Sequence, residues 1–142
     1  FNDLMYRSRS RFGSILVESR EVIMYLKNKL DKVKVLAVVA DQSPRINSRK
    51  IWSKMLNQET AFLESIEFIP RFTDSHVYFA SMKKTSRGRY EVNLEHINDS
   101  NIFKKNHSLE RYISCMETQI NENPGEWLWS HRRWKLTPEN NQ

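Results

Sequence analysis

The sequence contains little cysteine and little glycine. Among its 142 residues there is one cysteine, Cys115, which cannot form an internal disulfide. This excludes a disulfide-stapled secreted scaffold and favours a reducing compartment. The three glycines are isolated and cannot supply the Gly-rich loops that bind nucleotide phosphates. The four histidines have no close metal-ligand spacing, so no structural zinc site is predicted.

Long apolar runs are also missing. The longest clean run, residues 35–40, is far shorter than the roughly 20 residues that a transmembrane helix needs, and no signal-peptide pattern opens the chain. We therefore predict that the chain does not span a membrane. No repeat, linker or low-complexity tract divides it, so a single domain over residues 1–142 is predicted.

Positive charge is in excess. Lys and Arg number 23 and Asp and Glu 17, which gives a formal net charge of +6. The excess favours anionic partners: nucleic acid, phospholipid head groups or phosphorylated small molecules. Hydrophobic residues make up 39% of the chain, which is enough apolar surface to build a core and argues against general disorder.

Apolar spacing predicts several strands. Residues 35–40 are β-branched and apolar throughout, which suits a strand buried on both faces of a parallel or mixed sheet. Residues 76–83 and 89–96 suit a hairpin that turns at 86–88. Residues 45–58 fit either a loop or a short strand.

Helical spacing of apolar residues recurs in four segments. We expect Pro70 to end the third helix and Ser108 to cap the fourth, which follows a polar loop at 98–106. A helix that leads into a buried strand with a polar end indicates an α/β fold. The predicted helices cover residues 3–11, 19–32, 60–69 and 109–120.

The first predicted helix carries a basic cluster. Arg7, Arg9 and Arg11 alternate with other residues before Gly13. Guanidinium groups suit bidentate binding of phosphate, so the three arginines are candidate phosphate ligands. A solvated basic face near a chain end is the alternative interpretation.

Two polar residues follow the predicted buried strand. Asp41 and Gln42 stand at its carboxyl end, where ligands gather in open α/β sheets. They are therefore candidate site residues. The alternative is that Asp41 forms a turn before Pro44.

The densest mixture of aromatic and basic residues lies near the C-terminus. Such a cluster can bind nucleic acid by stacking and charge, or place tryptophan and arginine at a membrane interface. Alternatively, the tryptophans belong to the core and the arginines are solvated. We call the following seven residues the C-terminal cluster: Trp127, Trp129, His131, Arg132, Arg133, Trp134 and Lys135.

The segment 123–135 resembles the closing motif of the bacterial lipid A biosynthesis acyltransferases, the lauroyl and myristoyl transferases. In that family an Asn-Pro and a Trp-x-His-x-Arg-aromatic-Lys ending recur. The Arg-rich segment 6–13, the Asp-Gln at 41–42 and the Thr-Ala at 60–61 agree with the family in order and position. Residues 52–56, Trp-Ser-Lys-Met-Leu, depart from the family's Phe-Phe-Gly-like segment, which implies a differently shaped acyl-chain or acceptor pocket.

The resemblance also implies a catalytic His-x4-Asp/Glu dyad, whose carboxylate orients the histidine as general base for the acceptor hydroxyl. Each histidine here is followed five positions on by a residue that is neither Asp nor Glu. In the family the dyad lies upstream of the Arg-rich segment, after an N-terminal membrane anchor. We therefore expect this chain to be the C-terminal portion of such an enzyme, without a catalytic residue of its own and inactive alone. The four pairs are His76 and Ser81, His96 and Asn101, His107 and Tyr112, and His131 and Leu136.

By this resemblance, the fold is a partial three-layer α/β/α glycerolphosphate-acyltransferase-like domain with a mixed sheet. The parent enzyme would move a fatty acyl chain from acyl-acyl carrier protein, or acyl-CoA, to a hydroxyl of a lipid A precursor at the cytoplasmic face of the bacterial inner membrane. No metal or organic cofactor is implied.

The resemblance also suggests roles for the candidate residues. Arg7, Arg9 and Arg11 would grip phosphate, and Asp41 and Gln42 would line the site. The C-terminal cluster would pack the end of the domain or meet an anionic membrane surface. We also expect exposed sheet edges to favour homo-association. A basic nucleic-acid-binding module is the alternative function, although the resemblance implies no nucleic acid partner.

Overall fold

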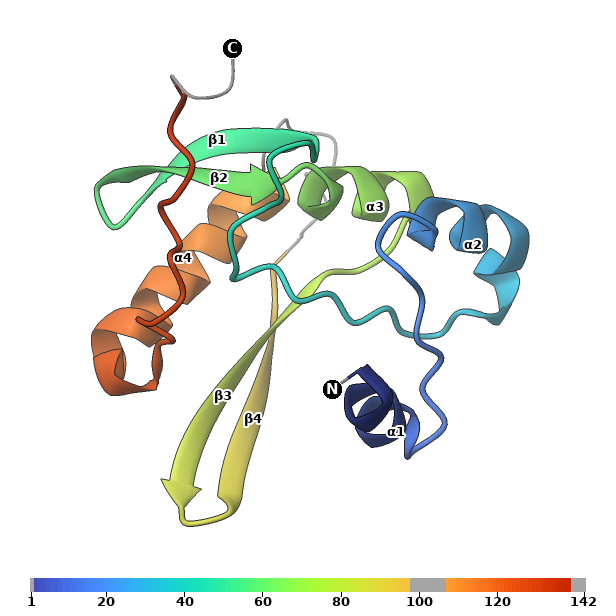
Figure 1. Ribbon diagram of the computed structural model, residues 1–142, viewed down its shortest axis with the longest axis horizontal. Coiled ribbons are helices and arrows are strands. Elements are labelled where there is room, and N and C mark those ends of the chain that lie inside the picture. The colour runs from blue at the N-terminus through green and yellow to red at the C-terminus, as the bar shows by residue number, and fades with distance from the viewer. Residues whose placement is uncertain (1, 98–106, 139–142) are drawn as a thin grey trace. The chain divides into compact units, whose positions relative to one another are not determined.

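The structure is a computed structural model that describes residues 2–97 and 107–138 (Figure 1). The chain divides into two compact units, Phe1–Ala37 and Val38–Gln142, which we describe separately. The polar loop predicted at 98–106 lies outside the described residues. Helices and strands are both present, as the α/β prediction requires.

The first unit is helical. It contains α1 (Asn2–Ser10), α2 (Val22–Lys29) and the short 3₁₀ helix η1 (Leu30–Lys32), so the first two predicted helices are confirmed. Gly13 has a φ of +83°, and its N–H donates to the carbonyl of Ser10 at 2.9 Å. A glycine in this left-handed conformation commonly ends a helix, which explains why α1 stops where it does.

The prediction of a buried strand at 35–40 is wrong. This segment forms neither helix nor strand and pairs with no strand in the part of the chain that the structure describes. Val35 and Val39 are 85% and 71% exposed. Apolar, β-branched residues favour an extended backbone, but a strand also needs a neighbour for its N–H and C=O groups, and local sequence does not specify that neighbour.

The second unit begins with an antiparallel pair, β1 (Lys50–Met55) and β2 (Gln58–Leu63). The strands are joined at Leu56 and Asn57, whose φ angles of 50° and 63° are those of a tight hairpin turn. The Leu56 N–H donates to Glu117 Oε1 at 2.6 Å, which holds the turn in place. Of the two alternatives for residues 45–58, the short strand is the one observed.

The helix predicted at 60–69 begins later and ends later. Residues 60–63 belong to β2, and α3 (Ser65–Thr73) runs through Pro70. Proline fixes φ near the helical value and removes one N–H, so a short helix tolerates it when the other bonds remain. The carbonyl of Pro70 accepts the N–H of Asp74, which has a left-handed φ of 49° and ends the helix.

The predicted second hairpin is confirmed. It consists of β3 (Tyr78–Ser86) and β4 (Arg89–His96), and Gly88 in its turn has a φ of +74°. Both sheets among the described residues are antiparallel pairs, so the expected mixed sheet is not observed there. One face of this hairpin is apolar and more than half exposed; it carries Tyr78, Met82, Tyr90, Val92 and Leu94.

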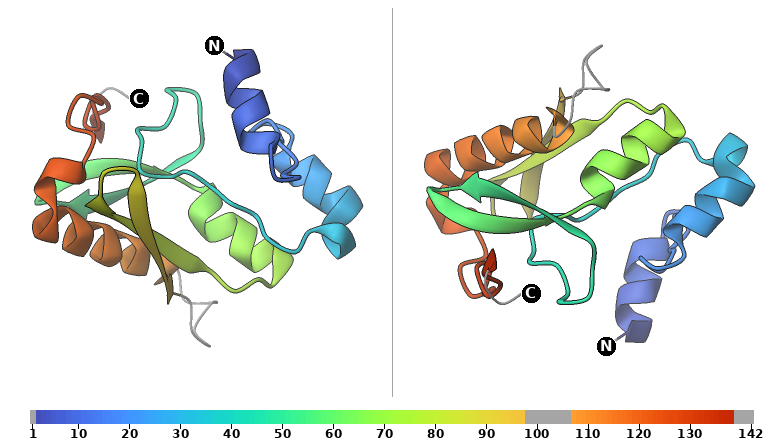
Figure 2. Two further views of the ribbon diagram at one scale, coloured as in Figure 1. Left: turned by 90° about the horizontal axis from the view of Figure 1, so that it is seen from below. Right: turned by 90° about the horizontal axis from the view of Figure 1, so that it is seen from above.

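The last predicted helix is confirmed as α4 (His107–Glu122), followed by the 3₁₀ helix η2 (Pro124–Glu126). Ser108 lies inside α4, so its predicted capping role is wrong. Helix α4 packs along the β1–β2 pair (Figures 1 and 2). Each fully buried side chain at this contact contributes about 1.5–3 kcal/mol to stability. The core consists of Met55, Phe62, Leu109, Ile113, Met116 and Ile120.

Within the described ranges, none of the helices is long and apolar enough to cross a bilayer.

Candidate functional site

The end of the chain is tied to β2 by a side-chain hydrogen bond. Trp134 donates its indole N–H to the hydroxyl of Thr60 at 2.9 Å. The Thr60 hydroxyl in turn donates to the carbonyl of Gln58 at 2.9 Å, and Thr60 is fully buried. Two segments that resemble the family's motifs, at 60–61 and 123–135, therefore meet in the second unit.

The segment that contains Asp41 meets the same cluster. The backbone N–H of Ser43 donates to Nε2 of His131 at 3.0 Å, across 88 positions of sequence. A ring that accepts at Nε2 is neutral and carries its proton on Nδ1. This bond holds residues 41–43 beside the C-terminal cluster. Asp41 is half-buried there, whereas Gln42 is exposed.

Arg133 carries its charge into the interior. It is 2% exposed, and its guanidinium carbon lies 4.7 Å from the centroid of the Phe62 ring, which is a cation–π contact. Burial lowers the pKa of the Arg133 guanidinium, and the opposing effects of Tyr112 and Asp41 raise it. Arginine nevertheless stays protonated in proteins, so this is a buried cation.

Tyr112 of α4 is the third member of this neighbourhood. Its ring makes edge contacts with Phe62 and Phe79, at centroid distances of 6.5 and 5.6 Å. Burial raises the pKa of the Tyr112 phenol, Asp41 raises it further, and Arg133 opposes both. The phenol is therefore neutral at physiological pH. We use the term Asp41 site for the group formed by Asp41, Tyr112 and Arg133.

The C-terminal cluster has an inner and an outer set. Trp127, His131, Arg133 and Trp134 are buried or half-buried. Trp129 is 57% exposed, and Arg132 and Lys135 are also exposed. The prediction that the tryptophans are core and the arginines solvated is correct for Trp127, Trp134 and Arg132, but wrong for Trp129, which is exposed, and for Arg133, which is buried. The seven residues line an open depression of about 260 Å³.

The three predicted phosphate ligands lie in the first unit and are exposed. Arg7 and Arg9 are two positions apart on α1, so they point to opposite sides of the helix. Arg11 follows the helix, and its guanidinium lies 5.5 Å from the ring of Phe12. Arg7 and Arg9 therefore do not share a face of α1.

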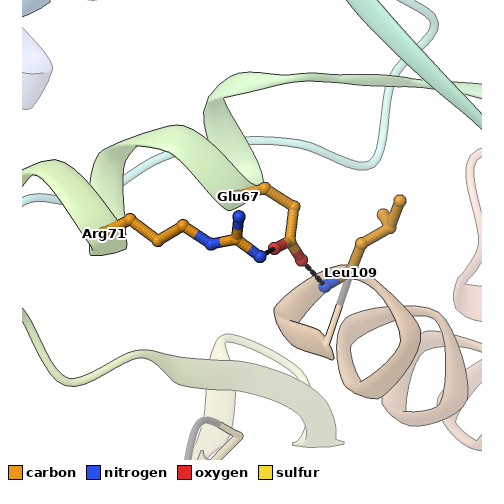
Figure 3. Close-up of polar contacts among 3 residues, drawn as sticks. All are labelled: Glu67, Arg71 and Leu109. Atoms are coloured by element: carbon orange, nitrogen blue, oxygen red, sulfur yellow. Dashed lines mark hydrogen bonds and ion pairs between the residues drawn. The ribbon is translucent and has the colours of Figure 1, made fainter. Parts of the chain in front are cut away.

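The structure also contains a buried carboxylate that sequence reasoning missed. Glu67 of α3 accepts the N–H of Leu109 at 2.6 Å and a guanidinium N–H of Arg71 at 3.1 Å (Figure 3). It therefore satisfies a free N–H in the first turn of α4, in place of the expected Ser108 cap. The only sequence signal was a carboxylate among the apolar residues of α3.

Sequence reasoning missed Tyr112 and Ser43 as well. Tyr112 follows the helical spacing of apolar residues in the helix predicted at 109–120, where an aromatic residue usually serves packing alone. Ser43 acts through its backbone N–H, which the side chain does not reveal. In the described part of the chain, no three His, Cys, Asp or Glu side chains gather in a way that could hold a metal ion.

The chain also matches a known protein family. Residues 1–136 match the sequence model of the family described as bacterial lipid A biosynthesis acyltransferase. The match covers most of the chain, so the chain belongs to this family. A search of curated proteins and a search of solved structures each gave no significant match.

Proposed function

We propose that the chain forms part of an enzyme that transfers a fatty acyl group from acyl-acyl carrier protein, or acyl-CoA, to a hydroxyl of a lipid A precursor. The observation that carries this proposal is the family match over residues 1–136. The geometry supports it, because residues 41–43, Thr60 and the C-terminal cluster, which are far apart in sequence, are joined by hydrogen bonds.

The reaction needs a general base. The acceptor hydroxyl attacks the thioester carbonyl as its proton passes to the base, the C–S bond breaks, and the departing thiolate takes that proton back from the base to leave as the thiol. Every histidine in this chain lacks a carboxylate five positions on. We therefore propose that the base is the histidine of a His-x4-Asp/Glu motif outside this sequence, and that the chain alone gives no turnover.

The proposed contribution of this chain is binding and electrostatics. The carboxylate of Asp41 acts electrostatically on Tyr112 and Arg133, and Gln42 is exposed next to it in sequence. Arg7, Arg9 and Arg11 are proposed to bind phosphate groups of the glycolipid or of the carrier's prosthetic arm. Because Arg7 and Arg9 point to opposite sides of α1, they would contact different phosphates rather than grip one together.

The outer set of the C-terminal cluster is proposed to contact the membrane. Trp129 and Leu128 are each more than half exposed, and Arg132 and Lys135 stand beside them in sequence. Tryptophan and cationic side chains suit an anionic bilayer surface, where each cation contributes about 1 kcal/mol. The proposed location is the cytoplasmic face of the inner membrane.

Vesicle binding tests the surface proposal. We expect R132A/K135A to weaken binding to vesicles rich in anionic lipid by about 10- to 30-fold, from roughly 1 kcal/mol per cation. R49A/K54A, which removes two exposed cations from another part of the second unit, is the matched control. Equal loss in both variants would show attraction by overall charge only. Tighter, steeply salt-dependent binding to single-stranded oligonucleotides than to vesicles would favour the nucleic-acid function instead.

An acyl-transfer assay tests the assignment of the base. The chain is incubated with labelled acyl-acyl carrier protein or acyl-CoA and a lipid A precursor. We expect no acylated product above the uncatalysed background. Robust turnover would contradict the proposal, because a base would then have to lie within this chain.

A further inference from the structure

The guanidinium group of Arg133 is a buried cation short of hydrogen-bond acceptors. Among the described residues, none bonds to its Nε or to either of its Nη atoms. The Phe62 ring contacts the face of the guanidinium group, but it accepts no hydrogen bond from the five N–H donors of that group. A buried charge without a partner is strongly destabilising, so a residue kept in this state calls for a physical explanation.

Asp41 supplies negative charge near this cation: its electrostatic effect on Arg133 opposes the effect of burial, without a direct hydrogen bond between the two groups. Two electrostatic neighbours of Arg133 are Tyr112 and Asp41, and of these two only Asp41 is an anion, since an ordinary phenol is neutral at physiological pH and burial raises the pKa of Tyr112 further. The hydrogen bond from Ser43 to His131 brings the two segments together, and Asp41 and Arg133 each lie two residues from that bond. The pair is therefore an anion and a cation on segments that are held side by side.

We propose that Arg133 is a positioning residue for Asp41: its buried charge holds the Asp41 carboxylate in place beside Tyr112. The importance of this pairing for activity rests on the proposed function, in which Asp41 is one of the residues that line the site. In this arrangement Phe62 contacts the face of the guanidinium group, and the charge of that group attracts the Asp41 carboxylate. Aspartate and arginine balance each other, so the Asp41 site has no net charge.

A double-mutant cycle in the whole chain tests this pairing, with the unfolding equilibrium constant as the readout. R133M keeps an unbranched side chain over Phe62 but removes the charge. Without Asp41 the cation is uncompensated, so R133M should be more favourable in the D41N background than in the wild type. We expect a difference of at least about threefold, as neighbouring residues commonly show. A difference below threefold would overturn the proposal.

Conservative and control variants separate charge from packing. R133K keeps the charge, so its effect should differ by less than threefold between the two backgrounds. Equal couplings for R133K and R133M would mean that Arg133 only packs, and would overturn the proposal. R132M removes the neighbouring, exposed arginine and should show no coupling to D41N.

A second measurement applies if R133M does not fold. D41N alone should raise the unfolding constant by at least about threefold, because it leaves Arg133 buried without its anion. E91Q, which neutralises an exposed carboxylate on β4, is the control and should change the unfolding constant by less than twofold. If D41N behaves like E91Q, the proposal fails. None of these measurements contains substrate, so they succeed or fail independently of the vesicle and acyl-transfer assays.

Discussion

Trp134 donates its indole N–H to the hydroxyl of Thr60 at 2.9 Å, although 74 positions separate the two residues. Thr60 lies in β2, directly before the buried Ala61 and Phe62, so the bond joins the end of the chain to the centre of the second unit. Arg133, next to Trp134, lies over Phe62. The C-terminal cluster is thus part of the core on one side and part of the surface on the other.

Removing this hydrogen bond should destabilise the second unit. T60V leaves the half-buried indole N–H without its acceptor, and we expect a loss of about 1–3 kcal/mol in the free energy of unfolding. Urea unfolding of T60V, W134F and the double variant measures the coupling, expected at about 1 kcal/mol. T118V alters an exposed threonine of α4 and should stay within about 0.5 kcal/mol. Additive effects of T60V and W134F would show that the bond contributes nothing.

Removing the carboxylate of Glu67 should destabilise the start of α4. E67A removes the acceptor of the Leu109 N–H and leaves that group buried, which should cost about 1.5–3 kcal/mol, the usual range for a bond to a charged group. Denaturant unfolding and hydrogen exchange of the Leu109 amide measure the effect. E110A, in the same turn but exposed, should lose at most about 0.3–1 kcal/mol from its interaction with the helix dipole. An unchanged exchange rate at Leu109 in E67A would contradict the capping role.

Tyr112 should make the fold sensitive to alkali. Its pKa is higher in the folded chain than the value of about 10 in an unfolded chain. The folded state therefore binds this proton more tightly, and the corresponding stability is complete below pH 10 and is lost as the pH rises above it. We expect the free energy of unfolding to fall by up to about 1.4 kcal/mol per pH unit there, and to fall less steeply in Y112F. Y90F, at an exposed tyrosine, should keep the wild-type slope.

Gly88 should be required by the turn of the second hairpin. A Cβ at this position meets no other atom within 4 Å, so the cost of G88A comes from its φ of +74° alone. We expect a loss of about 1–2 kcal/mol, largely recovered in G88N because asparagine tolerates the left-handed region. G125A, where space is equally open and φ is not positive, is the control. If G88A and G125A are equally stable in urea, the turn does not depend on glycine.

Local patterns predicted the elements that local forces stabilise. The amphipathic helices α2 and α4 and the β3–β4 hairpin follow from apolar spacing and from glycine in the turn. The segment 60–69 was mispredicted because its apolar residues fit both a helix and a buried strand. Pairing with β1 decided between the two, and that pairing joins residues 60–63 to partners 7 to 13 positions earlier in the chain.

The candidate site was predictable to the same limited extent. Asp41 and the C-terminal cluster are candidate site residues from the sequence alone, and the family match agrees with the resemblance that their motifs carry. Spacing could not show that Ser43 binds His131 or that Arg133 is buried over Phe62, since these contacts join segments about 70 to 90 positions apart. The buried role of Glu67 is not predictable from the sequence, because a carboxylate in a helix is ordinarily solvated.

The sequence by itself determined the family, the basic charge and the set of candidate site residues, because these depend on residue identity and order alone. The tertiary structure alone decided which of those residues lie together. Arg132 and Arg133 are chemically identical neighbours, yet one is exposed and the other is a buried cation near Asp41. The difference arises from burial, because a charge in the interior keeps an electrostatic strength that water removes at the surface.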